Sequence, residues 1–185
     1  DHGLTFGPDP AWGDKSALGG AIGNNSTGSH SLVYGKTDYY VEEVEAVLAD
    51  GTVTRLGEVA VEDLRAGADP EADDLLPRIY AEVVRILDEE ATEVDARYPD
   101  LKRNVSGYNL DALVEDARGE RPLPDGTGTD PDSEADTVNL ARLLAGSEGT
   151  LAVVTEATVS LEPAPETKAV ALLTYDSLLD AMEDV

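Results

Sequence analysis

The sequence predicts an α+β fold in which helices flank a mixed or antiparallel sheet, and three features of the chain support this prediction. Residues 41–56 contain two runs rich in β-branched side chains on either side of Asp50-Gly51, a dipeptide typical of a tight hairpin turn. Residues 73–98 place Leu, Ile and Val at three- and four-residue spacing between charged residues, which predicts an amphipathic helix packed on the sheet. Residues 151–161 predict a further strand, rich in Val and Thr.

The segments before and between these elements are expected to be less regular. Residues 1–38 are rich in Gly, Pro, Asn and Ser, which predicts an ordered loop region with short helical turns at most. Residues 118–136 predict a solvated acidic loop, because the spacing of their carboxylates does not match an EF-hand calcium site. Residues 137–145 then predict a short helix that is capped at its start by Asp136 or Thr137.

A proline-containing stretch near the end of the chain predicts a domain boundary. Residues 162–165 (Glu-Pro-Ala-Pro) interrupt the preceding strand. We therefore assign residues 1–163 to one domain and residues 164–185 to the start of a second. In this second part we expect a strand over residues 169–174 and a helix that begins at residues 175–177. Because the chain begins without Met and its last helix is cut short, we expect it to be a piece of a longer protein.

The composition excludes several classes of site. The chain has 185 residues, 41% of them hydrophobic, which is enough for one ordinary domain with a buried core. It contains no Cys, and this excludes disulfides, thiolate zinc sites, cysteine-ligated iron–sulfur clusters and a cysteine nucleophile within the segment. No apolar run approaches the ~18 residues that a membrane-spanning helix needs. We expect a protein without a membrane span, in a reduced cytoplasm.

The chain is strongly acidic, with 39 Asp and Glu against 13 Lys and Arg and a net charge of −26. Nucleic-acid phosphates and anionic lipids would be repelled, so we expect no nucleic-acid partner. The acidic residues are spread along the chain, which favours the surface of a halophilic protein from a high-salt cytoplasm, where salt screens their mutual repulsion. An acidic mimic of DNA is the less favoured alternative. The halophilic interpretation predicts salt-dependent folding.

Two glycine-containing segments are the best candidates for a ligand site. Residues 19–28 (GGAIGNNSTG) combine small side chains with turn formers, so that the main chain can approach a ligand closely. Within this run, residues 24–27 supply short polar groups. Residues 146–159 (GSEGTLAVVTEATV) place a glycine turn directly before a β-branched strand. The alternative for the first segment is an ordinary surface loop, since Asn, Ser and Gly often cluster in loops.

Together these segments resemble a known family. Residues 4–165 are similar to the second half of the FAD-binding domain of the vanillyl-alcohol-oxidase and p-cresol-methylhydroxylase (PCMH) superfamily, in its glycolate-oxidase-subunit and D-lactate-dehydrogenase-like branch. Four motifs carry the resemblance, in family order and over most of the chain: GPDP at 7–10, GGAIGNNSTGSHSLVYG at 19–35, GYNLDAL at 107–113 and GSEGTLAVVTEATVSLEP at 146–163.

The resemblance implies that residues 1–163 are the second lobe of a PCMH-type FAD-binding domain and that residues 164–185 begin a substrate, or cap, domain. FAD would be the cofactor, and the parent protein would oxidise a 2-hydroxy acid of the D-lactate, glycolate or D-2-hydroxyglutarate class. Catalytic residues and any metal ligands would lie outside this chain. Its partners would be FAD, the hydroxy acid and the rest of its own polypeptide, and the isolated piece would be inactive.

The same resemblance assigns cofactor contacts to three places. Pro8 and Asp9 would lie alongside the isoalloxazine ring. The segment near the pyrophosphate and ribityl chain would consist of Gly19, Gly20, Asn24, Asn25, Ser26 and Thr27. Glu148, Gly149 and Val154 would hold the nucleotide end.

Two further residues invite a chemical role. His30 is a candidate base or flavin attachment point, but a structural, hydrogen-bonded histidine is favoured because nothing in the sequence pairs it with an acid. Tyr108 would lie near the substrate side of the flavin or pack against the sheet. Two functions compete with hydroxy-acid oxidation. One is a non-redox acidic module that binds an anion or a protein. The other keeps FAD and acts on a sugar or an alcohol.

Overall fold

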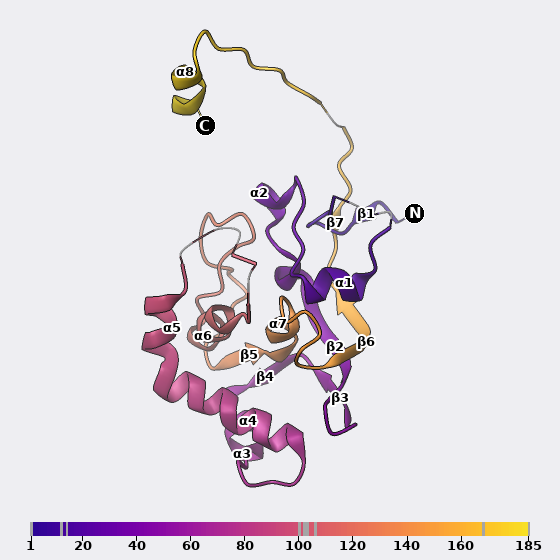
Figure 1. Ribbon diagram of the computed structural model, residues 1–185, viewed down its shortest axis with the longest axis vertical. Coiled ribbons are helices and arrows are strands. Elements are labelled where there is room, and N and C mark those ends of the chain that lie inside the picture. Colours follow the sequence, from indigo (N-terminus) through magenta and orange to yellow (C-terminus); the bar gives the residue numbers. More distant parts are fainter. Residues whose placement is uncertain are drawn as a thin grey trace.

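The structure is a computed structural model that confirms the predicted α+β class, with helices packed around small antiparallel sheets (Figure 1). Each strand pairing that it contains among the described residues is antiparallel. The described residues are 2–11, 13, 15–99, 101, 104–105, 107–167 and 169–184.

The main sheet has the strand order β3-β2-β6 and confirms the predicted hairpin. Strands β2 (Val41–Val47) and β3 (Val53–Leu56) pair directly, and Gly51 takes the left-handed φ of +87° that the turn requires. Strand β6 (Val153–Val159) pairs with the other edge of β2 and lies within the predicted range of residues 151–161. The sheet thereby joins two parts of the chain that are far apart in sequence.

Two short ladders complete the strands. Strand β1 (Leu4–Thr5) pairs with β7 (Glu162–Pro163), so both ends of the predicted first domain lie together. Strand β4 (Glu58–Ala60) pairs with β5 (Thr137–Asn139).

Strand β5 corrects the helix predicted over residues 137–145. Its first three residues are strand, because Val138 is fully buried opposite Val59 in the ladder with β4. Helix α7 is confined to Leu140–Leu144. Its cap is Asn139, whose Oδ1 accepts a 2.9 Å hydrogen bond from the Ala141 amide, and neither Asp136 nor Thr137 has this role.

The helical prediction for residues 73–98 is confirmed. Helix α4 (Leu75–Arg85) continues through the π-helical turn η2 (Ile86–Glu90) into α5 (Ala91–Arg97). Figure 1 shows these three as one continuous helical run that changes direction between α4 and α5, with α6 (Leu110–Arg118) beside α5 and α3 (Val61–Gly67) beside α4. The N-terminal region contains the short helices expected there: α1 (Leu18–Gly23), α2 (Ser31–Tyr34) and the 3-10 turn η1 (Thr37–Tyr40).

The hydrophobic core lies between the main sheet and the helices that cover it. It includes Val44 and Ala46 from β2, Leu113 from α6, and Ala141 and Leu144 from α7, all of them buried. Burying this apolar surface stabilises the fold and fixes the loops that leave the sheet.

The C-terminal residues follow the prediction for the helix but not for the strand. Residues 169–174 form no strand, because none of the described strands lies beside them, and Val170 is 99% exposed. Helix α8 (Leu178–Glu183) does form, with the Ser177 hydroxyl as its cap, at the end of an extended segment that leads away from the other elements (Figure 1). Lys168, near which a second domain is expected to begin, lies outside the described residues. None of the described helices is long and apolar enough to cross a membrane.

Candidate functional site

The two glycine segments meet in the structure. The Gly146 amide donates to the Ile22 carbonyl and the Glu148 amide donates to the Gly23 carbonyl, each at 2.9 Å. Gly146 has a φ of +83°, and a Cβ atom at this position would lie 2.7 Å from the Gly107 carbonyl oxygen. Glycine is therefore needed here for both conformation and space. The junction brings together residues that the resemblance assigns to the pyrophosphate and ribityl chain and residues that it assigns to the nucleotide end.

The turn after α1 is held from the protein interior. Asn25 is fully buried with a left-handed φ of +47°, and its Oδ1 accepts a 3.0 Å hydrogen bond from the Asp38 amide. The Ser26 carbonyl accepts bonds from the amide and the hydroxyl of Thr37, at 3.2 and 2.8 Å. Asn24 is exposed and donates its side-chain amide to the Ser26 hydroxyl at 3.1 Å. Asn25 thus fixes the turn, whereas Asn24 faces solvent.

The segment that contains Pro8 and Asp9 packs against the same turn. Pro8 is buried, and Asp9 is exposed with a φ of +40°. A Cβ at Gly28 would lie 1.8 Å from the Asp9 carbonyl oxygen, so only glycine permits this approach.

His30 has an acidic partner that the sequence did not reveal. Its Nδ1 lies 3.0 Å from Asp9 Oδ2, with the two side chains 44% and 50% exposed. The absence of an obvious acid was the ground for assigning His30 a purely structural role, and the structure corrects that premise. The sequence could not predict this pair, because it depends on the close packing of Gly28 against Asp9 in the folded chain.

Gly19 and Gly20 are not in the turn that their sequence suggested. Both lie in α1 on its exposed face, with no heavy atom within 4 Å of the position of an added Cβ. Gly149, at a φ of +75°, is equally open, and the neighbouring Glu148 is exposed at a φ of +51°. Val154 is half-buried and packs against the core. The junction therefore presents open main chain on both segments.

The polar residues of the turn divide by exposure. Ser26 and Thr27 are half-buried, and Thr27 is not among the described residues with a left-handed φ. Two cavities, of about 290 and 490 Å³, share Thr5, Phe6 and Asp9 in their walls. The smaller one extends along α1, and His30 borders the larger. Asp9 thus faces space that a ligand can enter.

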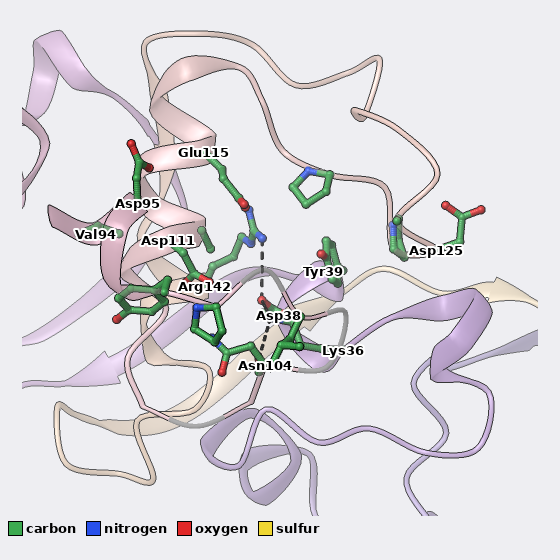
Figure 2. Close-up of a pocket in the computed structure, with 17 residues that line it drawn as sticks. Lys36, Asp38, Tyr39, Val94, Asp95, Asn104, Asp111, Glu115, Asp125 and Arg142 are labelled. Atoms are coloured by element: carbon green, nitrogen blue, oxygen red, sulfur yellow. Dashed lines mark hydrogen bonds and ion pairs between the residues drawn. The ribbon is translucent and has the colours of Figure 1, made fainter. Parts of the chain in front are cut away.

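A buried charged cluster behind the turn was not predicted from the sequence. It lines a cavity of about 450 Å³ and centres on Asp38, which is 1% exposed (Figure 2). Asp38 Oδ2 lies 3.3 Å from Lys36 Nζ and 3.8 Å from an Arg142 guanidinium nitrogen, and it accepts a 3.2 Å bond from the Asn109 side chain. Arg142 also pairs with Asp116. The scarcity of Lys and Arg in so acidic a chain was the one sequence signal that could have drawn attention to Lys36 and Arg142. Their burial cannot be inferred from their positions in the sequence.

Burial raises the pKa values of two groups in this cavity. Burial and the adjacent Asp111 carboxylate raise the pKa of Glu115 to about 7, against the opposing charge of Arg142. Burial, followed by the Asp38 carboxylate, raises the pKa of the Tyr39 phenol, which therefore stays neutral. Figure 2 shows the Glu115 carboxylate and Asp38 on different sides of the Arg142 guanidinium.

Across the part of the chain that the structure describes, no group of three or more His, Cys, Asp or Glu side chains is arranged to hold a metal ion. Tyr108 is 44% exposed, and its hydroxyl hydrogen-bonds at 3.0 Å with Thr150, a residue of the second glycine segment. It is therefore not a buried side chain of the sheet.

Comparison with known proteins supports the resemblance. A family model described as an FAD binding domain matches residues 1–57. The chain is 31% identical over 185 residues to a D-2-hydroxyglutarate dehydrogenase of Pantoea ananatis, covering 98% of this chain and 16% of the relative. It is 29% identical over 183 residues to the glycolate oxidase subunit GlcD of Bacillus subtilis, covering 99% of this chain and 24% of that protein.

A third relative is a D-lactate dehydrogenase of Archaeoglobus fulgidus, 27% identical over 184 residues, with 100% of this chain and 25% of the relative covered. The chain thus spans a quarter or less of each of these relatives. Residues 1–57 therefore match an FAD-binding domain, which gives FAD as the cofactor, and nearly the whole chain is similar to dehydrogenases and oxidases of 2-hydroxy acids.

Proposed function

We propose that this chain is the FAD-binding lobe of a flavin-dependent oxidoreductase that oxidises a 2-hydroxy acid. The junction between the two glycine segments carries this proposal, because the bonds from Gly146 to Ile22 and from Glu148 to Gly23 align two stretches of open main chain. The names of the relatives support the substrate class, since D-2-hydroxyglutarate, glycolate and D-lactate all carry a hydroxyl next to a carboxylate.

The residues present fit an extended dinucleotide cofactor. Where no side chain or neighbouring atom fills the space above Gly19, Gly20 and Gly149, a ligand can reach van der Waals distance of the main chain. In this proposal the exposed Asn24 and Glu148 border the cofactor, together with the half-buried Ser26 and Thr27.

The remaining predicted contacts are given different tasks. Asp9 would lie beside the flavin ring, because it is exposed and borders two cavities. Pro8, Asn25 and Val154 would act from behind by holding the main chain in place, since Pro8 and Asn25 are buried and Val154 packs on the core.

FAD, when bound, supplies the redox chemistry by accepting a hydride from the hydroxyl-bearing carbon of the substrate. The chain's own residues would bind and orient the cofactor. The buried side of the turn after α1, which contains Asn25, would exclude water from beneath it. No described side chain of this lobe is assigned to take the substrate proton. We therefore propose that the base and the substrate contacts belong to other parts of a longer polypeptide, and that this chain alone is inactive.

We also propose that residues 1–163 form the lobe and that residues 164–185 begin a substrate domain. The extended course of the second part supports this division, because its apolar residues contact little of the described fold. Val170 is 99% exposed and Leu172 is 87% exposed, which is costly for an apolar side chain unless further protein covers it.

The charge supports a high-salt cytoplasm as the setting. With a net charge of −26, mutual repulsion destabilises the compact state in dilute buffer, and molar salt screens it. The few cations are shared among several acids, as where Arg55 faces Glu43, Glu45 and Glu156.

The visible spectrum of the complete protein tests the proposal. We expect a yellow protein whose flavin absorbance bleaches anaerobically with one of D-2-hydroxyglutarate, D-lactate or glycolate, and the 185-residue chain alone serves as the control that should not turn over. A folded but colourless protein would contradict the flavin function and favour an acidic binding module. A yellow protein that none of the three acids bleaches would leave FAD binding intact and refute the substrate class.

A further inference from the structure

The side chain of Asp38 is the point at which three hydrogen-bond donors converge behind the cofactor turn. Its Oδ2 accepts from Asn109 Nδ2 at 3.2 Å and faces Lys36 Nζ at 3.3 Å and Arg142 Nη2 at 3.8 Å. Asp38, Lys36 and Arg142 are all buried, so solvent does not screen these interactions as it does at a surface. The charges of Lys36 and Arg142 therefore fix the position of the Asp38 carboxylate.

The main chain at Asp38 fixes the first glycine segment. Its amide donates to Asn25 Oδ1 at 3.0 Å, and the preceding Thr37 donates twice to the Ser26 carbonyl. Asn25 holds a left-handed φ of +47°, a conformation that a non-glycine residue keeps only when its surroundings determine it. The bonds from Thr37 and Asp38 are those surroundings.

The partners of Asp38 are in turn anchored to the second glycine segment. Arg142 belongs to α7, which ends immediately before the turn at Gly146. The Arg142 carbonyl accepts a 3.1 Å bond from Asn109, the same side chain that binds Asp38. Lys36 donates to the Asn104 carbonyl at 3.0 Å, which secures it beside the cavity shown in Figure 2. One carboxylate thus links both segments.

We infer that Asp38 is a positioning residue for FAD: its carboxylate holds Arg142, Lys36 and Asn109 while its amide holds Asn25, so that both glycine segments are aligned for the cofactor. This inference rests on the proposed function. It predicts that the Asp38 carboxylate affects FAD affinity without touching the cofactor, and that a substantial part of the effect is transmitted through Asn25.

The first test compares two substitutions that remove the same charge. In the complete protein, Asp38→Asn should weaken FAD binding by about tenfold or more, as expected when a buried charged hydrogen-bond network is broken. Asp88→Asn is the control, because Asp88 pairs with Arg65 on an exposed surface, and it should change the FAD dissociation constant less than about twofold. Quenching of FAD fluorescence on titration into the apoprotein measures both constants. Equal effects of the two variants would overturn the inference.

A double-mutant cycle separates positioning from general destabilisation. Asn25→Gly keeps the left-handed backbone at no steric cost and removes the acceptor of the Asp38 amide together with the rest of this buried side chain. If Asp38 acts through Asn25, adding Asp38→Asn to Asn25→Gly should weaken FAD binding much less than it does in the wild type. Fully additive losses would refute the inference, since they would mean that Asp38 acts by another route.

Each failure has its own signature. A wild-type protein that binds no FAD refutes the proposed function, and the inference with it. A wild type that binds FAD while Asp38→Asn binds it equally well refutes the inference alone. If Asp38→Asn does not fold, the Asn25→Gly variant tests the inference instead, because it leaves the charged cluster around Asp38 intact. It should weaken FAD binding and speed hydrogen exchange of the Asp38 amide, and unchanged FAD affinity in this variant would overturn the inference.

Discussion

The amide of Glu148 donates a 2.9 Å hydrogen bond to the carbonyl of Gly23, which joins the turn before β6 to the end of α1. A Cβ at Gly23 would come within 3.7 Å of Glu148 Cα, an ordinary contact distance, so the two main chains lie side by side. This contact joins the two segments that contain the open glycines, and it is the geometric basis for the proposal that FAD binds there.

Gly28→Ala should disrupt the packing of the turn on Asp9. Its Cβ would lie 1.8 Å from the Asp9 carbonyl oxygen, which forces a backbone shift and a loss of about 1–3 kcal/mol in the free energy of unfolding. Urea denaturation measures the change. Gly128→Ala is the matched control, because no atom lies within 4 Å of its added Cβ, and its effect should stay within about 0.5 kcal/mol. Similar effects at the two positions would contradict the close approach.

Gly146→Ala should cost more stability than Gly51→Ala. Both glycines have a left-handed φ, +83° and +87°, so an alanine meets about 1–2 kcal/mol of backbone strain at either position. Only Gly146 has a neighbour in the way, the Gly107 carbonyl oxygen at 2.7 Å from the added Cβ, whereas Gly51 has none within 4 Å. Thermal melts of the two variants compare them directly. Equal losses would show that the junction tolerates a side chain.

Glu115→Gln should make the stability less dependent on pH. The folded-state pKa of Glu115, about 7, lies above its ordinary value of 4.5, so the folded protein binds the proton more tightly than the unfolded chain. Its contribution to stability is fully present below pH 4.5 and is lost as the pH rises through 7. We therefore expect Glu115→Gln to gain stability over the wild type between these values and to keep that advantage at pH 8.

Denaturant melts from pH 4 to pH 8 provide the measurement for Glu115. The control is Glu71→Gln, at an exposed loop position, for which the difference from wild type should stay constant over the same interval. A constant difference for Glu115→Gln as well would rule out its raised pKa.

His30→Ala should change stability only slightly. The contact between His30 Nδ1 and Asp9 Oδ2 is short, at 3.0 Å, but about half of each side chain is exposed, and exposed pairs contribute about 0–1 kcal/mol even when both groups are charged. The free energy of unfolding in urea is again the measurement. A loss well above this range would indicate that His30 holds the turn through more than the pair with Asp9.

The melting temperature should rise steeply with salt. A net charge of −26 leaves strong repulsion unscreened in dilute buffer, and the Debye length falls to ~3 Å at 1 M salt. We expect the protein to melt at a higher temperature in molar KCl than in dilute buffer. Sucrose at matched osmolality is the control, because it is excluded from the protein surface but does not screen charge. A melting temperature that does not change with KCl would refute the halophilic interpretation.

The sequence by itself was sufficient for the local elements and the family. The Asp50-Gly51 hairpin and the helical periodicity of residues 73–98 are encoded by neighbouring residues, and both appear as predicted. The family resemblance carried by the glycine motifs likewise indicated an FAD-binding domain, and a family model of that description matches residues 1–57.

Tertiary structure decided the features that depend on distant partners. Thr137 starts a strand rather than a helix because β4 supplies its hydrogen bonds, and residues 169–174 form no strand because none of the described strands does so for them. His30 meets Asp9 only because Gly28 lets two loops touch. Asp38 lies beside two buried cations, Lys36 and Arg142, which come from separate segments, and no local sequence pattern encodes their burial. Local propensity sets short-range geometry, whereas contacts across the fold decide which polar groups are desolvated and paired.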